Sequence, residues 1–126
     1  MGIFNTLFGQ NDGNEDANKS DFWIPLEDIK QLDAIDDASE AKTVLIFKHS
    51  TRCIVSKMAL KEFNRDFDIQ GDVDAYFLDL LNHRDISNAI ATRYGVEHQS
   101  PQLLVLKNRQ VVKHTSHSDI SGNGPF

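Results

Sequence analysis

The sequence predicts an α/β domain in which a mixed central sheet lies between helices. Two observations support this. Strand-like segments alternate with segments of helical periodicity through most of the chain, an order that places strands parallel in one sheet. The last two predicted strands, 102–108 and 110–116, have almost no chain between them, and so short a link requires an antiparallel hairpin. With 126 residues, the chain is long enough for one hydrophobic core and too short for two ordinary ones.

Composition and charge narrow the class of protein. Apolar residues make up 40% and charged residues 25%, close to the average of soluble globular proteins. The net charge of −6 resides in residues 1–42, which carry 10 acidic and three basic residues. Residues 43–126 are nearly neutral and hold no basic stripe, so we expect no nucleic-acid binding. No segment approaches the roughly 20 apolar residues of a membrane helix, so we expect no stable membrane insertion.

The N-terminus and the cysteine content predict the compartment. The N-terminus lacks the basic flank and long apolar run of a signal peptide. The single cysteine cannot form an internal disulfide, so nothing in the sequence indicates an oxidising compartment. We therefore expect a cytoplasmic protein.

Residues 1–20 are predicted to form a flexible acidic tail, with the folded domain at 21–126. Residues 11–19, NDGNEDANK, contain no large apolar side chain and are typical of a disordered linker. The preceding MGIFNTLFG would place four apolar side chains on one face of a short helix. Three interpretations stay open: a frayed terminus, which we favour, a docking peptide for a partner or membrane surface, and an N-myristoylation pattern, which is often matched by chance.

The folded part is predicted to begin with a short strand and a helix. Residues 22–25, FWIP, predict an edge strand that Pro25 ends. Apolar residues then recur every three positions, which predicts an amphipathic helix with Glu27 and Asp28 in its first turn. These apolar residues are Leu26, Ile29, Leu32 and Ile35.

Residues 43–50, TVLIFKHS, predict the central strand of the sheet. Its apolar residues run continuously over four positions, as in a strand that is covered on both faces. A helix is predicted to follow from about residue 52 to 68, with Ser50 or Thr51 as its N-cap. Its inward-facing residues recur at steps of four and are Val55, Ala59, Phe63 and Phe67.

Two further segments are predicted before the terminal hairpin. Residues 74–80, DAYFLDL, predict a strand, and residues 83–95, HRDISNAIATRYG, predict a helix that stops at Gly95. Pro101 follows in a loop that leads into the hairpin. The tail DISGNGPF is rich in Gly and Pro, so we expect little regular structure there.

Cys53 is predicted to lie where the central strand ends and the next helix begins. Unpaired backbone N–H groups and the positive end of the helix dipole stabilise a thiolate at such a position. Arg52 and Lys57 flank the thiol, and Lys48 and His49 are also expected near it. A lone cysteine is more often a small buried hydrophobe. The cationic neighbours, and a position where α/β sheets place their sites, favour a reactive thiol instead.

Ser56 stands three residues after Cys53, and its hydroxyl is expected to face the same helix end and to hydrogen-bond the thiolate. None of the five histidines combines with Cys53 in zinc-ligand spacing, so we expect no metal. His49 as the base of a Cys–His hydrolase stays open, although nothing marks a third group to orient it. His114 and His117 are interpreted as surface residues.

Three features resemble the thioredoxin superfamily. They are the Cys-Ile-Val-Ser motif at 53–56 followed by Lys57, the Tyr-Gly-Val motif at 94–96 that leads to Pro101, and the order of the elements. The resemblance covers about residues 22–118 and implies a thioredoxin-like three-layer sandwich. The closing C-terminal helix of the superfamily is missing, so one flank of the sheet is expected to be bare and open to an oligomer contact.

The same resemblance implies a substrate-binding loop. Pro101 is expected to follow a cis peptide bond and to lie against the thiol. The backbone of its neighbours Ser100 and Gln102 is expected to pair with an extended substrate. More narrowly, the segments FKHSTRC, HQSPQ and TSHSDIS resemble the YtxJ family of monothiol bacilliredoxins. That family often has Pro where this chain has Ile54.

The YtxJ resemblance implies the chemistry. Cys53 is then the nucleophile that removes the low-molecular-weight thiol bacillithiol from mixed disulfides with cytoplasmic proteins. No cofactor is expected to be bound; bacillithiol acts as thiol co-substrate, and a second bacillithiol or a bacillithiol disulfide reductase regenerates Cys53. Thr51, Arg52 and Lys57 are candidates to stabilise the thiolate or to hold the carboxylates of bacillithiol, and Thr51 is equally a helix cap. Two alternatives stay open: a non-catalytic thioredoxin-fold adaptor, and a redox sensor on which bacillithiol is a regulatory mark.

Overall fold

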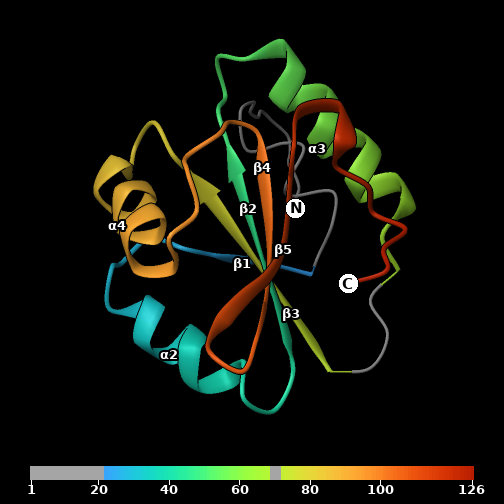
Figure 1. Cartoon of the computed structure of the whole chain (residues 1–126). Helices are drawn as coiled ribbons and strands as arrows, with labels where there is room; N and C mark the ends of the chain where they lie inside the picture. Colours follow the sequence, from blue (N-terminus) through green and yellow to red (C-terminus); the bar gives the residue numbers. More distant parts are fainter. Residues whose placement is uncertain (1–21, 69–71) are drawn as a thin grey trace, which may run out of the picture.

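The computed structural model describes residues 22–68 and 72–126, and the tail predicted at residues 1–20 lies outside the described residues. Within them the chain forms a mixed sheet in the order β1-β3-β2-β4-β5. Helices α2 and α4 cover one face of this sheet and α3 covers the other (Figure 1). The elements are β1 (Trp23–Pro25), α2 (Gln31–Ala38), β2 (Thr43–His49), α3 (Ile54–Asp66), β3 (Val73–Asp79), α4 (Arg84–Tyr94), β4 (Gln102–Lys107), β5 (Gln110–Ser116) and the 3-10 helix η1 (His117–Asp119).

The pairing of the strands confirms the predicted mixed sheet. Strand β3 runs parallel to both β1 and β2, and β1 lies at the edge of the sheet, as predicted. Strand β4 runs antiparallel to β2 and to β5. The β4–β5 hairpin turns at Asn108 and Arg109, whose φ angles of 53° and 66° are typical of a two-residue hairpin turn.

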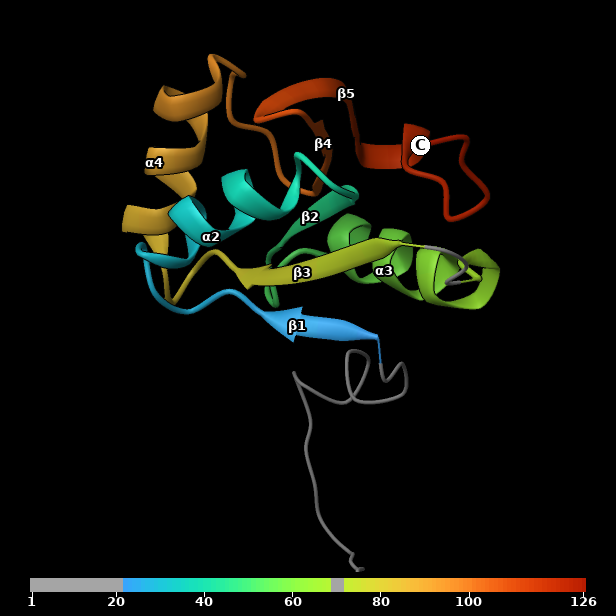
Figure 2. The ribbon, with the colours of Figure 1, turned by 90° about the horizontal axis from the view of Figure 1, so that it is seen from below.

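Strand β2 is buried along almost its whole length and divides the core in two. Val44 and Ile46 pack with α2 and α4, whereas Leu45 and Phe47 pack with α3. Figure 2 shows β2 between α2 and α3. Because side chains of a strand alternate between the two faces, both faces must be apolar when both are covered. The continuous apolar run therefore correctly predicted a central strand.

Helix α2 begins later than expected, at Gln31 rather than at Leu26. The N–H of Leu26 instead continues the β1 pairing by donating to a backbone carbonyl of β3, at 2.9 Å. The side chain of Gln31 then holds the intervening turn, because its Oε1 accepts from the N–H groups of Glu27 (2.7 Å) and Asp28 (2.9 Å). The two acidic residues therefore precede the helix, and Ile29 on the turn is 44% exposed.

Helix α4 matches its prediction closely. It stops at Gly95, whose φ of +66° is the left-handed conformation that ends many helices and that glycine adopts without strain. Ile86 and Ile90 are buried, as expected of its inward face. No helix in the described parts of the chain is long and apolar enough to cross a membrane.

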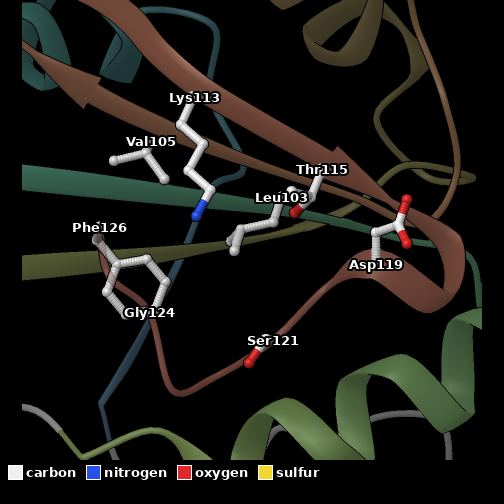
Figure 3. Close-up of a pocket in the computed structure, with 8 residues that line it drawn as sticks. All are labelled: Leu103, Val105, Lys113, Thr115, Asp119, Ser121, Gly124 and Phe126. Atoms are coloured by element: carbon white, nitrogen blue, oxygen red, sulfur yellow. The ribbon is translucent and has the colours of Figure 1, made fainter.

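The C-terminal segment covers the flank that we expected to be bare. In the described chain, β5 is followed by the one-turn η1 and then by irregular structure up to residue 126. Ile120 is nevertheless buried in the core under α3, and Phe126 packs against Phe67 with ring centroids 5.7 Å apart. Figure 3 shows this segment facing β4 and β5. The bare flank was therefore a wrong prediction, because apolar side chains of an irregular segment take the place of a helix.

Candidate active site

Cys53 is itself the N-cap of α3, with extended backbone angles (φ −109°, ψ 120°) and no side-chain cap bond. Its N–H donates to the carbonyl of Ser50 at 3.2 Å, and its carbonyl accepts the N–H of Lys57 at 3.0 Å. The prediction that Ser50 or Thr51 caps the helix was therefore wrong. The thiol is free and half-buried, and it stands where the helix dipole is positive.

Ser56 fixes the start of α3 to the end of β2. It is fully buried, its Oγ lies 2.8 Å from His49 Nδ1, and this Oγ accepts the N–H of Ser50 at 3.0 Å. In the described chain Ser56 makes no hydrogen bond to Cys53, so the bond expected between hydroxyl and thiol is not found. Because Ser56 takes the inward position of the first turn, Val55 is 48% exposed rather than buried as predicted.

His49 is built into the core on the α3 face of the sheet. The ring is almost fully buried and lies with its centroid 5.4 Å from that of Phe77. Its Nδ1 is used by the Ser56 hydroxyl. The Cys–His hydrolase alternative therefore gains no support from the position of this ring.

The loop before β4 has the expected backbone. The Ser100–Pro101 bond is cis, as the resemblance implied, and Pro101 is buried. Gln102 lies inside the sheet opposite Lys48 of β2, and its Nε2 donates to the carbonyl of Glu97 at 3.0 Å. The Oγ of Ser100 and the Oε1 of Gln102 are buried and have no hydrogen-bond partner among the described residues. The roles of both residues in substrate binding stay predictions.

A buried lysine lies beside a histidine on the α4 face of the sheet, a pair that the sequence did not predict. Lys48 Nζ is fully buried, donates to the carbonyl of Ser87 at 3.2 Å and lies 3.3 Å from His98 Nδ1. Burial lowers the pKa of Lys48 to about 8. The pKa of His98 is also lowered, first by burial and then by the charges of Lys48 and Arg84. The strand alternation that points His49 toward α3 sends Lys48 under α4.

A hollow of about 330 Å³ adjoins the loop that carries the thiol. Thr51 and Arg52 line it from the loop after β2, and Leu81, Asn82 and Arg84 line it from the segment after β3. The two loops follow the ends toward which the β2 and β3 arrows point in Figure 1, and they lead into α3 and α4. The sequence predicted Thr51 and Arg52 as site residues but missed Asn82 and Arg84. The sequence feature that could have indicated these two residues is their position just after β3, because the ends of parallel neighbours such as β2 and β3 lie side by side.

The first turns of α3 present apolar and basic side chains beside the thiol. Ile54 is 73% exposed and Met58 is 57% exposed. Lys57 is also exposed, and it makes no ion pair within residues 22–68 and 72–126. The backbone N–H of Lys57 bonds the carbonyl of Cys53, and among the described residues no hydrogen bond joins the two side chains, so the role of Lys57 stays a prediction.

Comparison with known proteins identifies the family. Residues 24–124 match the family described as "Monothiol bacilliredoxin BrxC". The chain belongs to this bacilliredoxin family. A solved structure of a protein with a thioredoxin fold is 33% identical to it, with a TM-score of 0.67, and the match covers 81% of this chain and 88% of that one. A single cysteine at a helix start in such a fold supports a thiol redox role for this bacilliredoxin.

Thioredoxins confirm the fold of the bacilliredoxin. The thioredoxin of Malassezia sympodialis is 20% identical, with a TM-score of 0.62, and the match covers 75% of this chain and 78% of that one. The thioredoxin NaTrxh of Nicotiana alata is 21% identical, with a TM-score of 0.60, and coverages of 77% and 82%. The predicted thioredoxin-like sandwich is therefore confirmed.

Proposed function

We propose that this bacilliredoxin removes bacillithiol from mixed disulfides with proteins, and that Cys53 is its nucleophile. The observation that carries the proposal is the free Cys53 at the N-cap of α3, with a fully buried serine at position 56. Ser56 cannot form a disulfide, so the described site offers Cys53 no second thiol. The thiol that resolves its mixed disulfide must then come from another molecule.

Two thiol–disulfide exchanges give the proposed cycle. The Cys53 thiolate first attacks the bacillithiol sulfur of the substrate, the old disulfide bond breaks, and the substrate cysteine leaves as a thiolate that takes a proton from water. A second bacillithiol thiolate then attacks the bacillithiol sulfur on Cys53. This step releases the Cys53 thiolate and forms bacillithiol disulfide, which a reductase returns to the thiol. Across the two exchanges one disulfide, the mixed disulfide of the substrate, is consumed and one, bacillithiol disulfide, is formed, so the two electrons enter the cycle when the reductase reduces bacillithiol disulfide to two thiols.

The chain contributes to this cycle groups that stabilise the thiolate and an apolar surface that binds the substrate protein. Cys53 is the attacking thiolate in the first exchange and the leaving thiolate in the second, and the N-terminus of α3 stabilises both. We propose that Thr51, Arg52 and Lys57 hold bacillithiol or stabilise the thiolate. The exposed Ile54 and Met58 provide an apolar surface on which the substrate protein rests while its disulfide reaches the thiol.

The proposal includes the subfamily, the compartment and the partners of the protein. It makes the protein a YtxJ-like member that acts in the cytoplasm on bacillithiolated proteins, with bacillithiol as co-substrate and a bacillithiol disulfide reductase as partner. The segments FKHSTRC, HQSPQ and TSHSDIS support it. Ser100, Pro101 and Gln102 are proposed to bind the substrate strand in the manner of thioredoxin-like proteins.

Intact-mass spectrometry tests the proposal. The protein is incubated with a bacillithiolated substrate protein, and both masses are recorded together with the free substrate thiol. We expect one bacillithiol adduct on the wild type, none on Cys53→Ala, and one substrate thiol released per adduct formed. If no substrate thiol appears although iodoacetamide still alkylates Cys53, the proposal fails.

A further inference from the structure

The hollow beside the thiol is lined by two arginines from different segments of the chain. Arg52 comes directly before Cys53, and Arg84 is the first residue of α4. Thr51 and Asn82 add a hydroxyl and an amide to the same lining. A volume of about 330 Å³ is at the lower end of the range for small-molecule sites. The hollow therefore has the size and the polar groups for part of a small polar ligand.

The two guanidinium groups have no carboxylate partner in the part of the chain that the structure describes. Within residues 22–68 and 72–126, neither Arg52 nor Arg84 forms an ion pair, whereas Arg65, Arg93 and Arg109 each pair with Asp or Glu. Asp79 near the hollow does not line it, and its Oδ2 accepts a bond of 2.8 Å from Asn82 Nδ2. Unpaired arginines in a concave surface favour an anionic ligand.

The positive charge continues from the hollow toward the Pro101 loop. Arg84 and the buried Lys48 both lower the pKa of His98, after the larger effect of burial, so their charges act on the same region. The Lys48 amine has only neutral hydrogen-bond partners in the described chain, the carbonyl of Ser87 and the ring of His98.

We propose that this hollow is the subsite for the carboxylates of the low-molecular-weight thiol, with Arg84 and Arg52 as the two cations that bind them. This proposal rests on the function proposed above and adds Arg84 and Asn82 to the site. Guanidinium groups bind carboxylates through paired hydrogen bonds, which orient as well as attract. Arg52, which lines the hollow, directly precedes Cys53 in the chain. A ligand held in the hollow therefore keeps its sulfur beside the thiol while the disulfide exchanges.

Two disulfides that differ in charge test the subsite through kinetics. The disulfide of mercaptosuccinate carries carboxylates beside its sulfur atoms, and bis(2-hydroxyethyl) disulfide carries none. We expect wild-type Cys53 to react faster with the carboxylated disulfide, and Arg84→Gln to reduce this preference by about tenfold, the effect of one lost charge-assisted bond. Arg84→Lys should fall between the two. The control Lys61→Gln removes the same charge from an exposed site on α3 and should keep the preference.

Binding without chemistry separates the subsite from the proposed function. S-methyl bacillithiol, which cannot exchange, is titrated into Cys53→Ser and into the Cys53→Ser/Arg84→Gln double variant by calorimetry. A dissociation constant about tenfold weaker in the double variant supports the subsite, even if the wild type releases no thiol from bacillithiolated protein and the proposed function fails. Equal dissociation constants, together with an unchanged disulfide preference, would overturn the subsite while leaving turnover intact. Circular dichroism confirms that each variant is folded.

Discussion

At the scale of single residues, Ser56 determines how the thiol is held. Its Oγ joins the ring of His49 to the N–H of Ser50, so the end of β2 and the start of α3 are linked beneath Cys53. Buried polar groups that are fully bonded hold a local geometry firmly. The position that holds a second cysteine in a dithiol motif therefore serves here to place the helix start on which Cys53 sits.

A proline substitution at Ile54 tests where α3 begins. It is the first helical residue, and proline is well tolerated there because the N–H it lacks has no partner within the helix. We expect Ile54→Pro to change the free energy of unfolding by no more than about 1 kcal/mol, measured by urea denaturation. Met58→Pro is the matched control further along the same helix and should cost about 3 kcal/mol. A similar loss in both variants would contradict the helix start at Ile54.

Lys48 makes the stability of the protein depend on pH. Burial lowers its pKa to about 8, whereas a lysine in the unfolded chain titrates near 10.4. Between these values the unfolded chain binds more protons than the native protein, so the free energy of unfolding rises with pH. The contribution is at most about 1.4 kcal/mol per pH unit, the slope for one proton.

The rise from pH 8 to pH 10 is measured by urea denaturation of the wild type and of Lys48→Met. We expect it to be smaller in Lys48→Met, because that variant has no buried amine. Lys61→Met is the control, since Lys61 is exposed on α3. Equal pH slopes in all three proteins would show that the Lys48 amine does not titrate as described.

Among the helices and strands, hydrophobic periodicity correctly predicted those whose buried side chains recur at regular spacing. Strand β2 and helix α4 were predicted to within a residue or two, because a continuous apolar run is typical of a covered strand and an inward stripe ending at glycine is typical of a helix. The start of α2 was misplaced, and α3 begins within two residues of its predicted start but with a different N-cap. In both cases a side chain within the helix, Gln31 or Ser56, bonds the backbone before it, and sequence periodicity carries no signal of such a bond.

The exposed apolar side chains of α3 give a prediction about substrates. Met58→Gln is expected to slow the reaction with a bacillithiolated protein by roughly fivefold, because an apolar interface contact is typically worth about 1 kcal/mol. It should leave the reaction with bacillithiol disulfide unchanged, since that small molecule needs no such surface. Val112→Gln, at an exposed apolar residue of β5, is the control. A Met58→Gln variant that slows neither reaction would show that this helix face does not bind the substrate protein.

In the whole molecule, the parallel strands β2 and β3 of the mixed sheet bring together site residues that are distant in the sequence. Cys53, Thr51 and Arg52 were predictable because they share one strand-to-helix junction. Asn82 and Arg84 join them because β2 and β3 end at the same edge, which becomes apparent once the strand order is known. The packing of the C-terminal segment against the α3 side of the core was also not predictable, because an irregular segment has no hydrophobic periodicity that shows which face it packs on.

A substitution at Gly122 tests how closely the C-terminal segment packs against α3. A Cβ at this position would lie 2.5 Å from the carbonyl oxygen of Phe63 and 2.8 Å from the backbone nitrogen of Phe67, so α3 and the segment would have to separate. We expect Gly122→Ala to lower the free energy of unfolding by about 1–3 kcal/mol, the usual cost of overpacking. Asn123→Ala, at an exposed position of the same segment, is the control. Equal stability of the two variants would contradict the close packing.

Multiple turnover tests directly whether Cys53 is a catalytic monothiol. A bacillithiolated protein in large excess is mixed with a small amount of this protein, bacillithiol and a bacillithiol disulfide reductase, and the substrate thiol is measured over time. We predict that each molecule releases many substrate thiols and that Cys53→Ala releases no more than the uncatalysed background. Release that stops at one thiol per Cys53 would identify a redox sensor, and release no faster than background would identify a non-catalytic adaptor. Either result would contradict the role of Cys53 as a catalytic monothiol.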